Sequence, residues 1–182
     1  MGKRRSRDAV EPLISQERIR ERVAELGREI THDYAGRPVL LLGILKGSAI
    51  FLADLIREID LVIDYDFVAL SSYGGRTDTT GVVRITKDTA VDVRGKDVLI
   101  VDDIVDTGWT LRMSYLAENL LARGAAGVKV CALLDKPGRR LVDVNIDYRG
   151  FQIEDEFVVG YGLDHEGRFR NLPYIGVLQQ IS

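Results

Sequence analysis

The chain has 182 residues, of which 46% are hydrophobic and 29% are charged, and its formal net charge is −3. This length and composition predict one globular domain with a single sizeable core, and the slight negative charge argues against broad nucleic-acid binding. The only basic cluster, in residues 3–7, precedes no apolar stretch, so it does not indicate a signal peptide. No segment is apolar enough to span a bilayer, so no membrane partner is expected.

The first predicted element is a long amphipathic helix. Ser15 is an N-cap candidate, with Glu17 in the first turn. Apolar residues then recur at helical spacing as far as about Tyr34. We expect residues 1–12 to form a flexible tail and residues 13–182 to form a single domain.

Strands and helices then alternate. Val39–Leu45 is a near-continuous apolar run, which is typical of a strand covered on both faces. The apolar spacing in Leu52–Ile59 predicts a second helix, and Leu61–Leu70 predicts a second strand. Ser71–Asp92 is rich in Gly, Ser, Thr and Asp, and it predicts a long loop, which is usually either a functional lid or a disordered segment.

The middle of the chain contains its most informative segment. Val98–Val101 predicts a buried strand, and a helix begins near Gly108 and ends with Gly124 as its C-cap. Further strands are predicted at Val128–Leu134 and Phe157–Val159. The alternation of strands and helices indicates an α/β fold with a mostly parallel sheet. The one cysteine, Cys131, lies in the first of these later strands, which favours a buried thiol in a reducing cytoplasm.

The junction between the central strand and its helix carries three carboxylates, two hydroxyls and a glycine. Unpaired backbone N–H groups at the start of a helix suit a bound phosphate. The adjacent carboxylates of Asp102 and Asp103 repel each other unless a cation or a hydrogen-bond donor lies between them. A sugar diol or Mg²⁺ would meet that need, so the junction suggests a nucleotide or an activated sugar as ligand.

Six motifs, in this order, resemble those of the type I phosphoribosyltransferases, and within them the hypoxanthine-guanine phosphoribosyltransferases. They are Leu45–Gly47, Ser71–Tyr73, Asp102–Thr110, Leu134–Pro137, Asp155–Asp164 and Arg170–Pro173. The resemblance covers about Leu13 to Leu178. It implies a Rossmann-like core and a small hood built from the N- and C-terminal segments. It also implies transfer of 5-phosphoribosyl from phosphoribosyl pyrophosphate to hypoxanthine or guanine, giving IMP or GMP and pyrophosphate with Mg²⁺.

The resemblance assigns the central segment to ribose and the 5′-phosphate. Asp102 and Asp103 would contact the ribose hydroxyls beside a Mg²⁺ ion, and Asp164 would hold a second ion. The family usually has Glu at position 102, so the shorter Asp puts its direct contact in doubt. Asp106 would be the general base that takes the proton from purine N7, although capping of the helix is a structural alternative. The whole segment comprises Asp102, Asp103, Ile104, Val105, Asp106, Thr107, Gly108, Trp109 and Thr110, of which Trp109 is expected to serve helix packing.

The leaving group and the purine fall to other segments. The resemblance assigns pyrophosphate to Lys46 and Gly47, where the peptide before the lysine can be cis, and to Arg170. Arg168 lies close enough in sequence to compete, and only the motif spacing favours Arg170. Purine recognition is assigned to Lys136, Phe157 and Val158, because an ammonium suits the O6 oxygen of hypoxanthine or guanine. Ser72 and Tyr73 would lie on a mobile loop that closes over the reaction.

Other functions remain open at this stage. A transferase of the same fold could prefer xanthine. The acidic balance and the absence of a basic face in the sequence argue against a nucleotide-sensing RNA-binding regulator. A receiver-type signalling domain would have its paired acids near the chain start, whereas here they come after residue 100. A dinucleotide-binding module is not expected, because no G-x-G-x-x-G follows a strand. The resemblance further implies a homodimer or homotetramer in the cytoplasm, with no nucleic-acid partner.

Overall fold

Six strands form one mostly parallel sheet, as the alternation of elements predicts. The computed structural model describes residues 10–73, 82–106, 109–139 and 145–179. The strands run in the order β4-β3-β2-β5-β6-β7, and only β4 is antiparallel to its neighbour. Their bounds are β2 Val39–Ile44, β3 Asp64–Tyr73, β4 Val82–Lys87, β5 Asp97–Val105, β6 Gly127–Asp135 and β7 Tyr148–Gln152.

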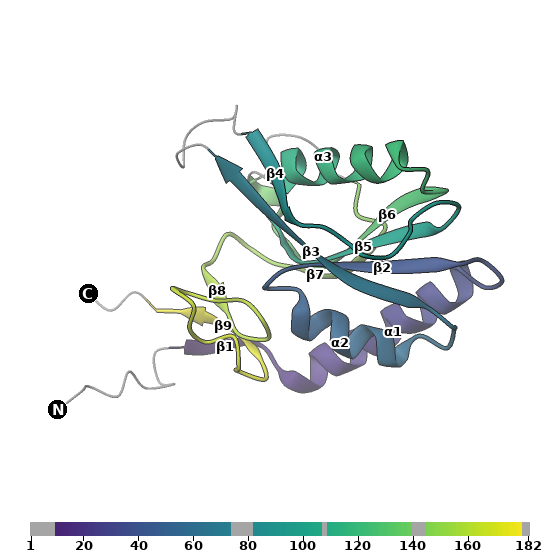
Figure 1. Ribbon diagram of the computed structural model, residues 1–182. Helices are drawn as coiled ribbons and strands as arrows, with labels where there is room; N and C mark the ends of the chain where they lie inside the picture. The colour runs from purple at the N-terminus through teal and green to yellow at the C-terminus, as the bar shows by residue number, and fades with distance from the viewer. Residues whose placement is uncertain (1–9, 74–81, 107–108, 140–144, 180–182) are drawn as a thin grey trace.

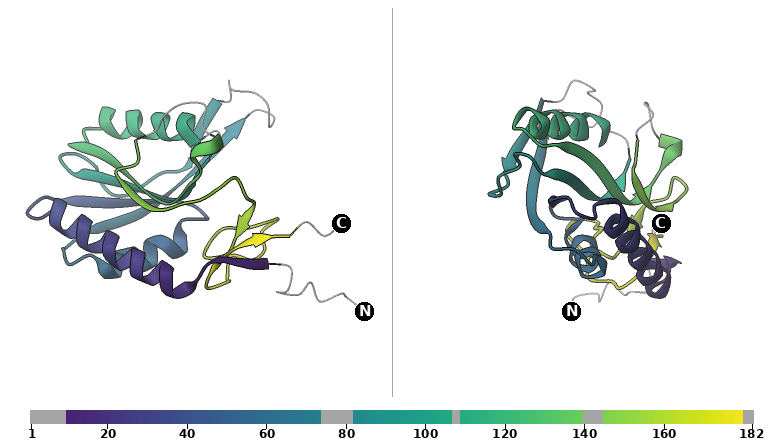
Figure 2. Two further views of the ribbon diagram at one scale, coloured as in Figure 1. Left: turned by 180° about the vertical axis from the view of Figure 1, so that it is seen from behind. Right: turned by 90° about the vertical axis from the view of Figure 1, so that its right-hand side faces the viewer.

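Helices cover both faces of this sheet (Figures 1 and 2). Helices α1 (Gln16–Asp33) and α2 (Ala49–Glu58) lie on one face, and α3 (Trp109–Ala122) lies on the other. Strand β2 is buried on both sides: Leu41 packs with the core beneath α1 and α2, whereas Leu40 and Leu42 pack with the core beneath α3. Because successive strand residues point to opposite faces, the continuous apolar run is explained.

The predicted first helix is confirmed. The Ser15 hydroxyl accepts a hydrogen bond from the backbone N–H of Arg18 at 3.3 Å and caps the helix start. Gly27 lets α1 approach α2, since a Cβ at that position would lie 2.5 Å from the Cβ of Glu58. None of the helices in the described part of the chain combines the length and apolar character that a bilayer span requires.

The long loop predicted over Ser71–Asp92 is partly wrong. Strand β3 continues to Tyr73 and pairs antiparallel with β4, so that Ser72 faces Val83 across the ladder. An edge hairpin can keep one face in water, and its polar residues therefore did not indicate a strand. The tip, residues 74–81, lies outside the described residues.

A second sheet lies at one end of the molecule, where the hood was expected (Figure 1). It contains β1 (Val10–Ile14), β9 (Ile175–Leu178) and β8 (Val158–Val159), in the order β1-β9-β8. The predicted tail boundary is therefore wrong, because residues 10–12 pair with β9. The strand predicted at Phe157–Val159 is reduced to β8 and belongs to this small sheet instead of the central one. Strand β7 was not predicted at all.

Candidate active site

The predicted functional residues follow three neighbouring strands. Lys46 and Gly47 come after β2, Asp106 follows β5, and Lys136 follows β6. Strands β2, β5 and β6 are adjacent and parallel, so their carboxyl ends meet at the same edge of the sheet. In open α/β sheets this edge is where ligands bind.

Gly47 lies at the centre of this edge, and two segments close on it. A Cβ on Gly47 would lie 1.6 Å from the Oδ2 atom of Asp103. From the other side, a Cβ on Gly162 would lie 2.1 Å from the carbonyl oxygen of Gly47. Gly162 has φ of 102°. On the Gly47 side, the Leu45–Lys46 peptide is cis, as the resemblance implies it can be. Only glycine fits at positions 47 and 162, and the sequence had drawn attention to the first alone.

Arg170 is held against the segment that contains Gly162. Its Nη1 donates to the carbonyl oxygen of Gly162 at 2.6 Å, and its Nη2 lies 2.5 Å from Oδ1 of Asp164. The other carboxylate oxygen of Asp164 accepts a hydrogen bond from the backbone N–H of Gly167 at 2.7 Å. Arg168 is exposed and closes a backbone turn with His165. Of the two arginines, Arg170 is thus the one whose guanidinium is fixed beside Gly162.

Asp102 and Asp103 form a buried acidic pair at the end of β5. Burial raises the pKa of Asp102 well above its ordinary value, and the neighbouring charge of Asp103 raises that pKa further. Burial also raises the pKa of Asp103, and the positive charge of Arg170 counteracts part of that increase. The pair is thus costly to ionise in isolation, and a cation or hydroxyl donors would favour its charged form.

Two of the residues assigned to the purine, Lys136 and Phe157, lie near each other. The backbone N–H of Lys136 donates to the carbonyl oxygen of Val105 at 3.1 Å, and its ammonium donates to the carbonyl oxygen of Glu156. Phe157 is 54% exposed, and its ring meets the His165 ring edge to face with centroids 5.3 Å apart. The sequence had assigned His165 no role, and nothing in its spacing could have revealed this contact.

Other predicted residues are placed differently or are not described. The side chains of Ile104 and Val105 pack into the two cores, so only their backbone can face a ligand. Asp106 is partly buried after β5, and Val158 is buried in β8. Ser72 and Tyr73 end a strand instead of lying on a loop, and their side chains are not described. Thr107 and Gly108 lie outside the described residues, and α3 begins at Trp109 and Thr110, whose side chains are not described either.

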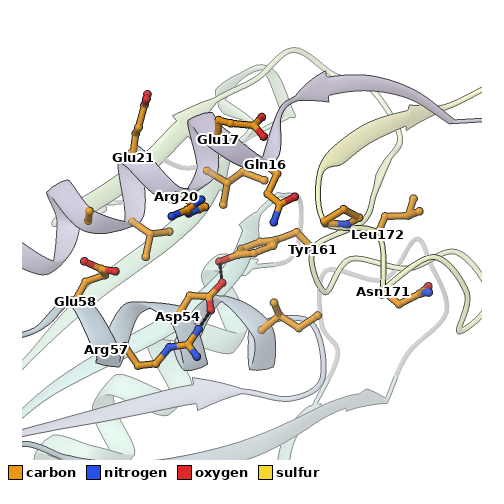
Figure 3. Close-up of a pocket in the computed structure, with 15 residues that line it drawn as sticks. Gln16, Glu17, Arg20, Glu21, Asp54, Arg57, Glu58, Tyr161, Asn171 and Leu172 are labelled. Atoms are coloured by element: carbon orange, nitrogen blue, oxygen red, sulfur yellow. Dashed lines mark hydrogen bonds and ion pairs between the residues drawn. The ribbon is translucent and has the colours of Figure 1, made fainter.

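A groove of 980 Å³ lies away from this edge, between α1, α2 and residues 171–173 (Figure 3). Of the lining residues, only Tyr161, Asn171, Leu172 and Pro173 come from the segments that carry the resemblance. Tyr161 reaches the groove from the turn that contacts Gly47, and its hydroxyl meets Asp54 of α2.

Comparison with known proteins identifies the family. The model of the phosphoribosyl transferase domain matches residues 12–166. The chain is 49% identical over 172 residues to the hypoxanthine-guanine phosphoribosyltransferase of Bacillus subtilis (strain 168), covering 94% of each protein. It is 52% identical over 167 residues to the one from Lactococcus lactis subsp. lactis (strain IL1403), covering 92% of this chain and 90% of that protein.

Longer relatives and solved structures agree. The chain is 48% identical to the bifunctional protein TilS/HprT of Listeria monocytogenes serotype 4b (strain F2365), and it spans 26% of that protein's length. A crystal structure of a hypoxanthine phosphoribosyltransferase from Staphylococcus aureus superposes with a TM-score of 0.90 at 46% identity, covering 97% of both chains. The chain therefore belongs to the phosphoribosyl transferase family, in its hypoxanthine-guanine phosphoribosyltransferase branch.

Proposed function

We propose that this protein transfers the 5-phosphoribosyl group of phosphoribosyl pyrophosphate to hypoxanthine or guanine, giving IMP or GMP and pyrophosphate. The observation that carries the proposal is the packing of Gly47 between Asp103 and Gly162, beside Arg170. This packing brings a basic loop, an acidic pair and a guanidinium to one edge of the sheet. Cleavage at an anomeric carbon develops oxocarbenium-like charge, and it requires both a stabilised leaving group and an aligned nucleophile.

The departing pyrophosphate is assigned to Lys46, Gly47 and Arg170. Lys46 is exposed just after β2, which leaves its ammonium accessible to an anion. Arg170 is oriented by its contacts with Asp164 and Gly162, so less conformational freedom is lost when its guanidinium binds phosphate oxygens.

Mg²⁺ fits the acidic groups. Asp102 and Asp103 would hold one ion, because burial makes their joint ionisation costly without a positive charge. Asp164 would hold a second, since its carboxylate has lone pairs beyond those used by Arg170 and Gly167. Among the described residues, no three His, Cys, Asp or Glu side chains cluster, so water and phosphate oxygens would have to complete the coordination of each ion. When bound, the ion supplies positive charge to the pyrophosphate.

Asp106 is proposed as the general base at purine N7. It follows the same strand as the acidic pair and is only partly buried, so its carboxylate can reach a bound base. Lys136 would donate to purine O6, with the carbonyl oxygen of Glu156 holding its ammonium in place. Phe157 presents a half-exposed ring for stacking, and the backbone of Val158 would read the edge of the base. Adenine carries a donor at position 6, where Lys136 offers only donors, and it should therefore be rejected.

The direct test is a substrate panel. Initial rates are measured with phosphoribosyl pyrophosphate and each of hypoxanthine, guanine, xanthine and adenine, with and without added Mg²⁺. We expect turnover with hypoxanthine and guanine that requires Mg²⁺, and little with adenine. Faster turnover with xanthine would reassign the base pocket, and no pyrophosphate release with any purine would refute the proposal.

The remaining expectations concern assembly and location. We propose a homodimer or homotetramer, which sedimentation equilibrium at micromolar protein tests directly. We also propose a cytoplasmic location, in keeping with a chain whose single cysteine, Cys131, is a buried thiol.

A further inference from the structure

Tyr161 occupies an unusual position in the turn that closes on the pyrophosphate loop. Its φ is 49°, between Gly160 at 100° and Gly162 at 102°. A left-handed backbone is unfavourable for tyrosine, so other contacts must hold it there. The side chain is 6% exposed, and its hydroxyl donates to Oδ2 of Asp54 at 2.6 Å (Figure 3). Burial and the Asp54 carboxylate raise the pKa of Tyr161, so its hydroxyl stays protonated and remains a donor.

This hydrogen bond joins the two segments assigned to pyrophosphate. Asp54 lies on α2, which begins at Ala49, directly after the loop that contains Lys46 and Gly47. On the other side, Tyr161 is followed at once by Gly162, which packs against Gly47. The two partners are 107 residues apart in the sequence, so the bond links distant parts of the chain.

Further hydrogen bonds connect this turn to Arg170. The backbone N–H of Tyr161 donates to the carbonyl oxygen of Leu172 at 2.9 Å. Gly162 donates to the carbonyl oxygen of Arg170 at 3.0 Å, and its own carbonyl oxygen accepts from the Arg170 guanidinium at 2.6 Å. A displacement of Tyr161 would therefore move the guanidinium relative to the loop.

We propose that Tyr161 and Asp54 are positioning residues for the pyrophosphate half of the site: their hydrogen bond sets the spacing between the Lys46–Gly47 loop and Arg170. Neither residue touches the reacting atoms. The inference rests on the proposed function, since it needs these two groups to bind the diphosphate. Effects on the ribosyl donor should consequently exceed effects on the purine.

The test is Tyr161→Phe, which removes the hydroxyl and keeps the ring. We expect the KM for phosphoribosyl pyrophosphate, and for pyrophosphate in the reverse reaction, to rise about tenfold, since small misplacements of binding groups cost this much or more. The KM for hypoxanthine should change less than about twofold, because Lys136 and Phe157, which are assigned to the purine, take no part in these hydrogen bonds. Asp54→Ala should reproduce this pattern, whereas Asp54→Asn keeps an oxygen acceptor and should recover part of the affinity.

The chain offers a matched control. The Tyr148 hydroxyl donates to Oδ2 of Asp33 at 2.7 Å, and Tyr148 is 3% exposed, but this pair lies on β7 and the end of α1. Tyr148→Phe removes the same kind of bond and should lower the melting temperature by a similar amount while leaving every KM unchanged. If the Tyr161→Phe and Asp54→Ala effects are coupled, the double variant should be no worse than either single variant.

Two outcomes overturn the inference. One is a Tyr161→Phe enzyme whose KM values match those of Tyr148→Phe, and the other is an equal rise in KM for hypoxanthine and for the ribosyl donor. The Arg170→Ala variant distinguishes a failure of this inference from a failure of the proposed function. If Arg170→Ala raises the donor KM and Tyr161→Phe does not, only the positioning role is wrong. If Arg170→Ala leaves the donor KM unchanged, the pyrophosphate assignment falls and the inference falls with it.

Discussion

Replacing Gly162 with alanine should disable the proposed pyrophosphate site without unfolding the protein. The added Cβ would lie 2.1 Å from the carbonyl oxygen of Gly47, where real contacts are 3.0 Å or more. The two backbones must therefore separate by about 1 Å, and a displacement of that size at a reacting site can cost about 10²-fold in rate. The residue also keeps φ of 102°, which adds about 1–2 kcal/mol of backbone cost for a residue with a side chain.

Gly36→Ala is the control, because it carries the backbone cost of a left-handed alanine without the steric clash. Gly36 has φ of 75°, and a Cβ there would meet nothing within 4 Å. It lies between α1 and β2, far along the chain from every proposed site residue. Gly36→Ala should lose about 1–2 kcal/mol in urea unfolding, because it places alanine in a left-handed backbone. Gly162→Ala should lose about 1–3 kcal/mol more, because its Cβ also clashes with Gly47.

The assay is the initial rate at saturating hypoxanthine with varied phosphoribosyl pyrophosphate. We expect kcat/KM for the donor to fall about 10²-fold in Gly162→Ala, and Gly36→Ala to match the unmodified enzyme. The reasoning is refuted if Gly162→Ala retains donor kcat/KM within about twofold of Gly36→Ala under conditions in which both variants are folded. That result would mean that the loop and the turn can separate without moving the groups proposed to bind pyrophosphate.

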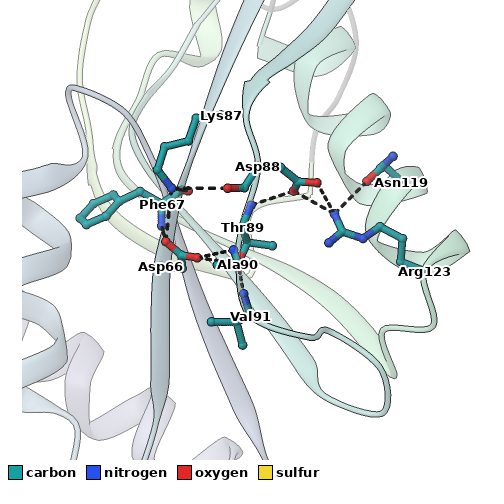
Figure 4. Close-up of polar contacts among 9 residues, drawn as sticks. All are labelled: Asp66, Phe67, Lys87, Asp88, Thr89, Ala90, Val91, Asn119 and Arg123. Carbon is teal, nitrogen blue, oxygen red and sulfur yellow. Dashed lines mark hydrogen bonds and ion pairs between the residues drawn. The ribbon is translucent and has the colours of Figure 1, made fainter.

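Three further outcomes are expected. Asp106→Asn should lower kcat by about 10²–10⁴-fold while IMP binding persists in calorimetry, and unchanged turnover would exclude it as the base. Lys136→Ala should weaken purine affinity more than donor affinity, and equal losses would misplace the base pocket. Asp66 accepts hydrogen bonds from Thr89 and from the backbone N–H of Ala90 (Figure 4). Burial opposes the change, but the hydrogen bond from the backbone N–H of Phe67, together with those from Thr89 and Ala90, lowers the pKa of Asp66 from 3.8 to about 2. Its contribution of about 1–2 kcal/mol is therefore complete above about pH 5 and is lost as the pH falls toward 2. In urea unfolding at pH 6, 4 and 3, the free energy of unfolding should fall less with pH for Asp66→Asn than for the unmodified protein. An equal fall in both proteins would contradict this.

Elements whose signals are local were predictable from the residues alone. The Ser15 cap and an apolar stripe predict helix α1, and an apolar run that needs cover on both faces predicts β2. The chemistry of the β5 junction was equally readable, because adjacent Asp102 and Asp103 cannot be explained by packing. The family motifs then gave each residue a role.

Elements with weak periodicity were not predictable in the same way. Strands β1, β7 and β9 are short, and the segment that forms β4 carries polar residues that an edge strand tolerates. Strand β8 has only two residues, and nothing near it in the sequence indicates that it pairs in the hood. Each of these strands is defined by its partner more than by its own pattern.

The folded chain, in contrast, decided how the site is assembled. Gly162 meets Gly47, Arg170 binds the carbonyl oxygen of Gly162, and Tyr161 meets Asp54 across 107 residues. Propensity and hydrophobic period reflect interactions within a few residues, so they predict helices and buried strands. Contacts between distant segments depend on how the elements pack, and no local pattern encodes them.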